Sequence, residues 1–315
     1  MPASVETQRP RNPTALFALL VITVIWGWTF VWMKQGIVAG EVRFGAAGRT
    51  ATIGLYLTLR FGLAALILPL VSPAARRGID LEAWKGGAVI GGLLLAGFLF
   101  QMFGLQDVTP AVSAFLTSLY VLFTVFLMIA IQRRLPHGLV LAGALSATLG
   151  AAFVSGPPRL SFDLGEWLTV ACAFIFALHI LATDSITRRS APMPVTLTTF
   201  VVVTAGSLAT IAWGFEGLPE PRLGALVELA TTRAFAIPLI LSSILATVLA
   251  ISLMNSFQRK VEPVRAAILY ALEPVWAALV AICVGLADPS PWLIFGGGAL
   301  LAGNWIAELG AVRRH

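Results

Sequence analysis

Apolar residues in this chain gather into long uninterrupted stretches, and most charged residues fall in the short segments between them. A helix needs about 20 mostly apolar residues to cross the hydrocarbon core of a bilayer. The short alternating strands that would indicate a β-barrel are not seen. The sequence therefore predicts an all-α, polytopic membrane protein with ten transmembrane helices. The predicted spans are Thr14–Met33, Ala51–Leu70, Gly86–Leu105, Ala111–Ile131, Gly138–Ser155, Leu164–Thr183, Val195–Phe215, Ala234–Phe257, Val264–Leu286 and Trp292–Glu308.

The second half of the chain repeats the first. Residues 108–150, shifted forward by 153 positions, align without a gap on residues 261–303. A unit that recurs at about half the chain length indicates an internal duplication. Each unit holds five helices, so the second must enter the membrane from the opposite side, which predicts two inverted repeats. The identities include Val108 and Val261, Pro110 and Pro263, Leu119 and Leu272, Gly143 and Gly296, and Gly150 and Gly303.

This duplication sets the predicted domain organisation. We expect an N-terminal tail at residues 1–13, a first five-helix repeat at 14–155, a linker at 156–163, a second repeat at 164–308 and a tail at 309–315. Each repeat needs the other to bury its packing face, so the two form one folding unit.

The charge distribution predicts the orientation. The chain is 58% hydrophobic and 11% charged, with a mean hydropathy of +0.90 and a net charge of +6. With the N-terminus inside, the inner loops carry 14 of the 21 lysines and arginines, the outer loops carry six, and Arg60 lies within a span. Cytoplasmic loops carry the excess of basic residues in membrane proteins. We therefore expect both termini in the cytoplasm, and the positive charge does not indicate a nucleic-acid partner.

The sequence offers no catalytic motif. Walker A, His-Glu-x-x-His and Gly-x-Ser-x-Gly patterns are missing, and the loops are too short for a soluble catalytic or nucleotide-binding domain. Cys172 and Cys283 each stand alone in an apolar segment, which is typical of small core residues. We therefore expect a protein that is not an enzyme and has no cofactor or metal site. Its expected partners are a small-molecule substrate and membrane lipid, and the oligomeric state is left open.

Glu273 and Arg60 lie near the middle of predicted spans, where a charge is costly and often functional. Glu273 precedes Pro274, which is expected to kink the helix. Glu273 is either a proton or substrate site, or a structural carboxyl that accepts hydrogen bonds from opened backbone. Arg60 reaches the interface, pairs with a carboxylate such as Glu273, or holds helix-end carbonyls together, and the structural role is favoured.

Other polar and aromatic residues are candidates for the wall of a central cavity. His179 could titrate near neutral pH, although a neutral packing histidine fits equally well. Interfacial belts explain most tryptophans, but Trp28 and Trp276 lie deeper than a belt requires. The candidate substrate-binding residues are Trp28, Gln101, Tyr120, His179, Ser243 and Trp276. Taken singly, each polar residue in this set also fits a plain helix–helix hydrogen bond.

Four motifs resemble the EamA family of the drug/metabolite transporter superfamily. They are Trp26-Gly27-Trp28-Thr29-Phe30-Val31, Leu59-Arg60-Phe61-Gly62-Leu63-Ala64-Ala65, Ala114-Phe115-Leu116-Thr117-Ser118-Leu119 and Ala266-Ala267-Ile268-Leu269-Tyr270-Ala271-Leu272-Glu273-Pro274-Val275. The resemblance covers essentially the whole chain. It implies an inner-membrane carrier with a central cavity between its halves, in which the fifth and tenth helices are peripheral.

This resemblance implies a function. The leading hypothesis is a secondary transporter in the bacterial inner (plasma) membrane that exports small polar metabolites, foremost amino acids, by alternating access. Aromatic amino-acid exporters are one branch with this architecture. The alternatives are a drug-efflux or metabolite-uptake carrier of the same superfamily, and a passive channel. The substrate, the direction of transport and the coupling ion are not fixed by the sequence.

Overall fold

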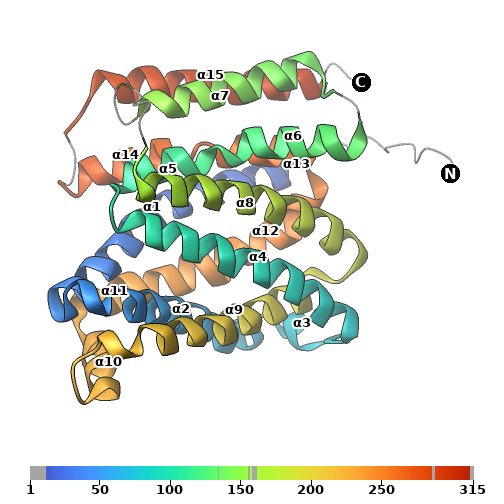
Figure 1. Cartoon of the computed structure of the whole chain (residues 1–315). Coiled ribbons are helices and arrows are strands. Elements are labelled where there is room, and N and C mark those ends of the chain that lie inside the picture. The colour runs from blue at the N-terminus through green and yellow to red at the C-terminus, as the bar shows by residue number, and fades with distance from the viewer. Residues whose placement is uncertain (1–11, 134, 155–156, 158–161, 286–287, 313–315) are drawn as a thin grey trace.

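The computed structural model describes residues 12–133, 135–154, 157, 162–285 and 288–312, and this part of the chain is helical with no strand (Figure 1). The predicted all-α class is confirmed. The α-helices are α1 (Pro13–Phe44), α2 (Arg49–Val71), α3 (Pro73–Arg76), α4 (Leu81–Leu105), α5 (Pro110–Ser118), α6 (Tyr120–Gln132), α7 (Gly138–Val154), α8 (Leu164–Arg189), α9 (Pro192–Gly214), α10 (Arg222–Thr231), α11 (Arg233–Leu241), α12 (Ala250–Phe257), α13 (Pro263–Tyr270), α14 (Glu273–Cys283) and α15 (Pro291–Val312). A π-helical segment, Ser242–Leu249, joins α11 to α12.

Eight helical segments in the described part of the chain are long and apolar enough to cross a membrane. The predicted fifth and tenth spans correspond to α7 and α15, whose apolar stretches are shorter. At 1.5 Å per residue, the 17 residues of α7 span about 25 Å, against about 30 Å for a typical hydrocarbon core. The chain is thus a multi-pass membrane protein with eight clear spans, and ten spans stay a prediction.

Several predicted boundaries were wrong. Helix α1 does not end at Met33 but continues to Phe44, because the chain turns only at Gly45, which has a φ of 65°. Its N–H donates to the Glu41 carbonyl at 2.8 Å, which closes the helix. The stretch between the predicted spans Val195–Phe215 and Ala234–Phe257 contains a further helix, α10. The predicted C-terminal tail begins inside α15, while residues 1–11, most of the linker and residues 313–315 lie outside the described residues.

Local sequence explains where the helices begin. The Asp80 side chain accepts from the Ala83 N–H at the start of α4, and Asn12 does the same for Ala15 at the start of α1. At the start of α8, the Glu166 carboxylate accepts from the Asp163 N–H at 2.8 Å as part of a capping box. Such caps satisfy amide donors that the first turn of a helix leaves free.

The helices form a layered bundle (Figure 1). Helix α2 packs on α9 on one side, α4 packs on α8 in the middle, and α1 packs on α12 and α14. Helices α7 and α15 pack tightly against each other and form a layer at the edge of the molecule. The Ser146 hydroxyl of α7 donates to the Ala299 carbonyl of α15 at 3.1 Å. This pair is therefore a peripheral support that leaves the middle of the bundle to the other helices.

Glycines set the close approach of α7 and α15. A Cβ atom on Gly150 would lie 2.5 Å from the Leu300 amide nitrogen and 2.6 Å from the Gly296 carbonyl oxygen. A Cβ atom on Gly143 would lie 2.6 Å from the Gly303 carbonyl oxygen. Only glycine lets the two backbones pack at this separation, as is common for helices in lipid.

We expect Gly150→Ala to lower the free energy of unfolding by about 1–3 kcal/mol, because the added methyl overpacks the α7–α15 contact. Thermal melting of the detergent-solubilised protein measures the change. Gly298→Ala is the matched control on α15, since a Cβ there meets nothing within 4 Å. It should leave the melting temperature unchanged or raise it slightly, because alanine is the better helix former. Equal melting temperatures for the two variants would contradict the contact.

Candidate functional site

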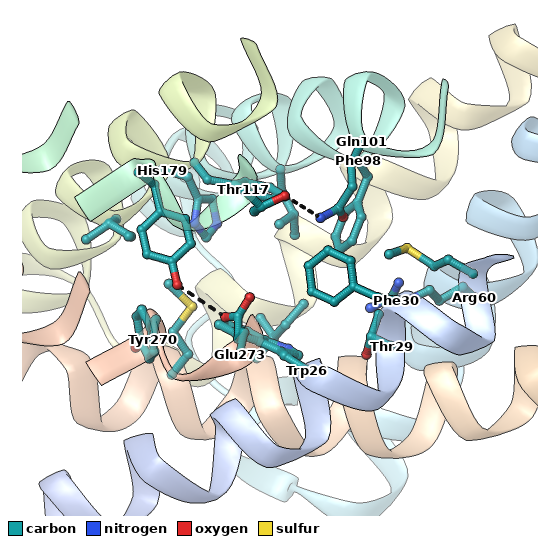
Figure 2. Close-up of a pocket in the computed structure, with 17 residues that line it drawn as sticks. Trp26, Thr29, Phe30, Arg60, Phe98, Gln101, Thr117, His179, Tyr270 and Glu273 are labelled. Carbon is teal, nitrogen blue, oxygen red and sulfur yellow. Dashed lines mark hydrogen bonds between the residues drawn. The ribbon is translucent and has the colours of Figure 1, made fainter. Parts of the chain in front are cut away.

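A cavity of about 70 Å³ lies in the middle of the bundle (Figure 2). Its wall combines aromatic side chains, aliphatic side chains and a few polar groups. It is formed by α1, α2, α4, α5, α6, α8, α12, α13 and α14, and neither α7 nor α15 contributes to it. The lining residues are Trp26, Thr29, Phe30, Met33, Arg60, Leu94, Phe98, Gln101, Thr117, Tyr120, Phe176, His179, Ile180, Ile251, Met254, Tyr270 and Glu273.

One face of α1 supplies part of the wall. Trp26, Thr29, Phe30 and Met33 follow the i, i+3, i+4, i+7 spacing of a single helical face. The Trp26 indole N–H donates to the Ala246 carbonyl at 3.2 Å, and its ring lies 5.4 Å from that of Tyr270. Trp26 therefore joins α1 to the π-helical segment and to α13.

Glu273 occupies one region of the cavity. It is 5% exposed, and the Tyr120 hydroxyl donates to its Oε1 at 3.5 Å, a long hydrogen bond. It is the first residue of α14, with Pro274 directly after it, so its carboxyl lies at a helix N-terminus where negative charge is favoured. The position of Glu273 thus comes from a helix that is interrupted in mid-membrane.

The interruption before α14 has an equivalent in the first half. Helices α13 and α14 are separated at Ala271–Leu272, and α5 and α6 are separated at Leu119. Leu119 and Leu272 are 153 positions apart, yet Val121 stands where the second half has Pro274. Proline at the start of α14 suits the break, but the break in α5–α6 forms without one.

Arg60 occupies another region of the cavity, and in Figure 2 Phe30 lies between it and Glu273. Its side chain is 0% exposed, so the expectation that it could reach the interface was wrong. Its Nε donates to the Thr247 hydroxyl at 2.7 Å, and its guanidinium carbon lies 4.5 Å from the centre of the Phe98 ring. Nη1 and Nη2 have no hydrogen-bond partner among the described residues. The ion pair with Glu273 does not form in the described structure.

The π-helical segment orients the partner of Arg60. The Thr247 hydroxyl donates to the Ser242 carbonyl five residues earlier, at 2.9 Å, and accepts from Arg60. The Ser242 hydroxyl also forms a hydrogen bond with the Tyr56 hydroxyl at 2.6 Å. Tyr56 lies on α2, one turn before Arg60. π-helical turns often occur at functional sites, and this one fixes α2 against the helix that carries Thr247.

Further polar groups of the wall lie on α4, α5 and α8. Gln101 Nε2 donates to the Thr117 hydroxyl at 3.4 Å. His179 is 3% exposed, and its Nε2 has no hydrogen-bond partner within the described part of the chain. The Phe98 and Phe176 rings, 5.7 Å apart, lie beside these groups. The cavity can therefore hold an apolar or aromatic group and offer a few polar contacts to it.

The predicted candidates divide into two groups. Gln101, Tyr120, His179, Arg60 and Glu273 all line the cavity, far apart in sequence but together in space. The other three lie elsewhere.

Trp28, Ser243 and Trp276 are the predicted candidates that do not line it. Trp28 stacks on Trp32 on another face of α1. The Ser243 hydroxyl donates to the Leu239 carbonyl of its own turn at 2.8 Å. The Trp276 indole N–H donates to the Thr23 hydroxyl at 3.0 Å.

Aromatic residues of the wall were missed. Trp26, Phe30, Phe98, Phe176 and Tyr270 were not among the candidates, although Trp26 and Phe30 share the face of α1 that contains Thr29. The helical spacing of apolar residues around Thr29 and Gln101 was the signal that could have found them.

Among the described residues, no group of three or more histidine, cysteine, aspartate or glutamate side chains is placed to hold a metal ion. The polar groups of the wall are distributed over several helices. This arrangement is suited to binding a small molecule by scattered contacts.

Three comparisons with known proteins agree with this architecture. Residues 163–308 match the EamA-like transporter family. An uncharacterized transporter of Archaeoglobus fulgidus is 26% identical over 298 residues, covering 92% of this chain and 84% of that protein. A protein of known crystal structure is similar with a TM-score of 0.64 over 93% of this chain and 98% of its own. It is only 18% identical, which supports the fold alone. The similarity to the EamA-like transporter family thus covers the second half of the chain, which contains the last of the four motifs.

Proposed function

We propose that this membrane transporter is a secondary carrier that exports small polar metabolites, foremost amino acids, by alternating access across the bacterial inner membrane. The observation that carries the proposal is the composition of the cavity wall, which draws on equivalent positions of the two halves of the chain. Carriers built from inverted repeats place their substrate site near the bilayer midplane at the repeat interface.

The lining residues support the inverted repeat because most of them form pairs. Helices α1 and α8 match at an offset of 150 residues, and the later helices match at 153. Among the lining residues, only Met33, Arg60 and Leu94 fall outside these pairs. The pairs are Trp26 and Phe176, Thr29 and His179, Phe30 and Ile180, Phe98 and Ile251, Gln101 and Met254, Thr117 and Tyr270, and Tyr120 and Glu273.

Direct contacts between equivalent residues add to this support. Equivalent residues of two repeats meet only on the two-fold axis that relates them. The Tyr120–Glu273 and Ser146–Ala299 hydrogen bonds both join positions 153 residues apart. We propose that the axis passes through both contacts, and hence through the cavity.

The size of the cavity supports a carrier. A volume of about 70 Å³ has room for a few waters, since each needs on the order of 10–15 Å³ of such space. A metabolite therefore requires the helices around the cavity to move. Interruptions between α5 and α6, between α13 and α14, and at the π-helical segment supply places where helices can bend.

The distribution of basic residues supports cytoplasmic termini. The start of α1 and the end of α15 lie at the same end of the bundle in Figure 1. The loop around α3, with Arg76 and Arg77, lies at that end too, and α10 lies at the other. This arrangement fits the orientation in which cytoplasmic loops carry the excess of positive charge.

We expect the purified protein, reconstituted in proteoliposomes, to exchange at least one labelled amino acid of the twenty common ones in a counterflow assay. Exchange should saturate with concentration, because each cycle of a carrier moves bound substrate. Empty liposomes are the control. Non-saturating flux would indicate a channel, and exchange restricted to hydrophobic cations would indicate drug efflux.

We expect Thr29→Cys and Gln101→Cys, made in a background with Cys172 and Cys283 replaced by alanine, to react with water-soluble thiol reagents. The transported amino acid should slow that reaction, because both positions line the cavity. Trp28→Cys is the matched control, one residue away on α1 but outside the cavity wall. If substrate slowed the labelling of Trp28→Cys as much as that of Thr29→Cys, the assignment of the Thr29 face of α1 to the cavity wall would be contradicted.

We expect Glu273→Gln to abolish the dependence of transport on a pH gradient. Glutamine keeps the size and the acceptor for Tyr120 but cannot exchange a proton. The free energy of unfolding should change by only about 0.3–2 kcal/mol, the scale of a charge at a helix N-terminus, because no ion pair with Arg60 is lost. Transport at varied inside and outside pH, together with thermal melting, measures both effects. A strongly destabilised variant that keeps its pH response would show that the carboxyl is structural.

A further inference from the structure

The guanidinium of Arg60 is a buried charge that the protein satisfies only in part. The side chain is 0% exposed and lines the cavity. Of its three nitrogens, Nε donates to Thr247, whereas Nη1 and Nη2 have no hydrogen-bond partner among the described residues. A charge in a membrane interior is normally paired with an opposite charge or with polar groups. The two free nitrogens therefore indicate a missing partner.

The contacts that do exist hold the guanidinium in place. The faces of Phe98 and Phe61 lie 4.5 Å and 5.4 Å from its central carbon. Aromatic faces stabilise a cation without occupying its N–H donors. Thr247 fixes Nε and is itself fixed by its bond to Ser242. The side chain is thus oriented before any ligand arrives, which limits the entropy lost on binding.

Within the described chain, no acidic side chain meets Arg60. Glu273 lies apart from Arg60 in the cavity (Figure 2) and accepts a hydrogen bond from the Tyr120 hydroxyl. Asp184 of α8 is also largely buried, and its carboxylate pairs with Arg188 at 3.1 Å. A planar guanidinium with its two Nη atoms free matches the two oxygens of a carboxylate.

We propose that Nη1 and Nη2 of Arg60 bind the carboxylate of the transported molecule. This proposal rests on the proposed function and narrows it: the substrate is a carboxylate with a side chain that fits the aromatic wall. Thr247 is a positioning residue that aims the guanidinium. An α-amino acid and a simple organic acid offer the same carboxylate, so the experiment must separate them.

Thermal stabilisation of the purified protein tests the subsite without relying on transport. A ligand that binds only the folded state raises the melting temperature according to its concentration and affinity. The three probes are phenylalanine, phenethylamine, which lacks the carboxylate, and 3-phenylpropionate, which lacks the ammonium group. We expect phenethylamine to bind the wild-type protein about tenfold or more weakly than phenylalanine, because a site built around a polar group rejects an analogue that lacks it. If 3-phenylpropionate binds as tightly as phenylalanine, the site accepts organic acids in general. If it binds weakly, the site requires the ammonium group of an amino acid as well.

Substitutions at Arg60, with Lys34 as the control, show whether Arg60 causes the preference for phenylalanine over phenethylamine. Arg60→Gln should bring phenylalanine down to the affinity of phenethylamine, and Arg60→Lys should retain part of the preference because it keeps the charge but loses the planar fork. If Arg60→Gln does not fold, the probe preference of Arg60→Lys alone tests the role of Arg60. Lys34→Gln is the control, since Lys34 donates to the carbonyls of Leu105, Gln106 and Val108 and is outside the cavity wall. It should keep the wild-type preference.

Three results would overturn the subsite: no probe stabilises the wild-type protein, phenethylamine binds it as tightly as phenylalanine, or both Arg60 variants keep the full preference. A protein that binds carboxylates through Arg60 but exchanges no amino acid in proteoliposomes would contradict the proposed function while leaving the subsite in place. The two proposals can therefore fail separately.

Discussion

The structure depends on one constraint: polar groups at membrane depth must find partners inside the protein, because lipid offers none. Most buried hydroxyls in the described chain meet it locally. Those of Thr169, Thr187 and Ser207 each donate to the carbonyl four residues earlier on their own helix. Such groups pack anywhere in a bundle and carry no functional meaning. Arg60 and His179 differ, because each has a buried nitrogen with no partner in the described structure and each lines the cavity.

This contrast separates the helices around the cavity from the α7–α15 pair. The α7–α15 pair is joined through close backbone contact at glycines and carries no charged residue into the cavity. The helices around the cavity are interrupted at Leu119, at Ala271–Leu272 and at the π-helical segment. Interrupted helices expose backbone groups that a rigid support would keep paired. The proposed substrate site therefore lies among the interrupted helices, which are costlier to build than the α7–α15 pair.

Much of the architecture could be predicted from the sequence, because apolar stretches near 20 residues allow few alternatives in a membrane. The end of α1 could not, since Gln35–Phe44 is polar enough to read as a loop and only the φ of 65° at Gly45 reveals the true terminus. The depth of Trp28 in its span predicts a place in the cavity wall, but depth does not specify which face of the helix a residue occupies. The polarity of Ser243 predicts the same, but its hydroxyl is satisfied by the Leu239 carbonyl of its own helix. The π-helical segment contains no proline or glycine that would have predicted it from the sequence.

Within the proposed duplication, the charges break the symmetry of the cavity. Tyr120 and Glu273 occupy equivalent positions, and so do Leu94 and Thr247. The second repeat thus supplies both the carboxyl and the hydroxyl that orients Arg60, while the first supplies a phenol and a leucine. Both interrupted helices begin near the proposed axis, where the partial positive charge of a helix N-terminus favours an anion. In α14 the Glu273 carboxyl occupies that position. In α6 the Tyr120 hydroxyl turns to Glu273 instead, so one carboxyl interacts with both half-helices and a second one is not required.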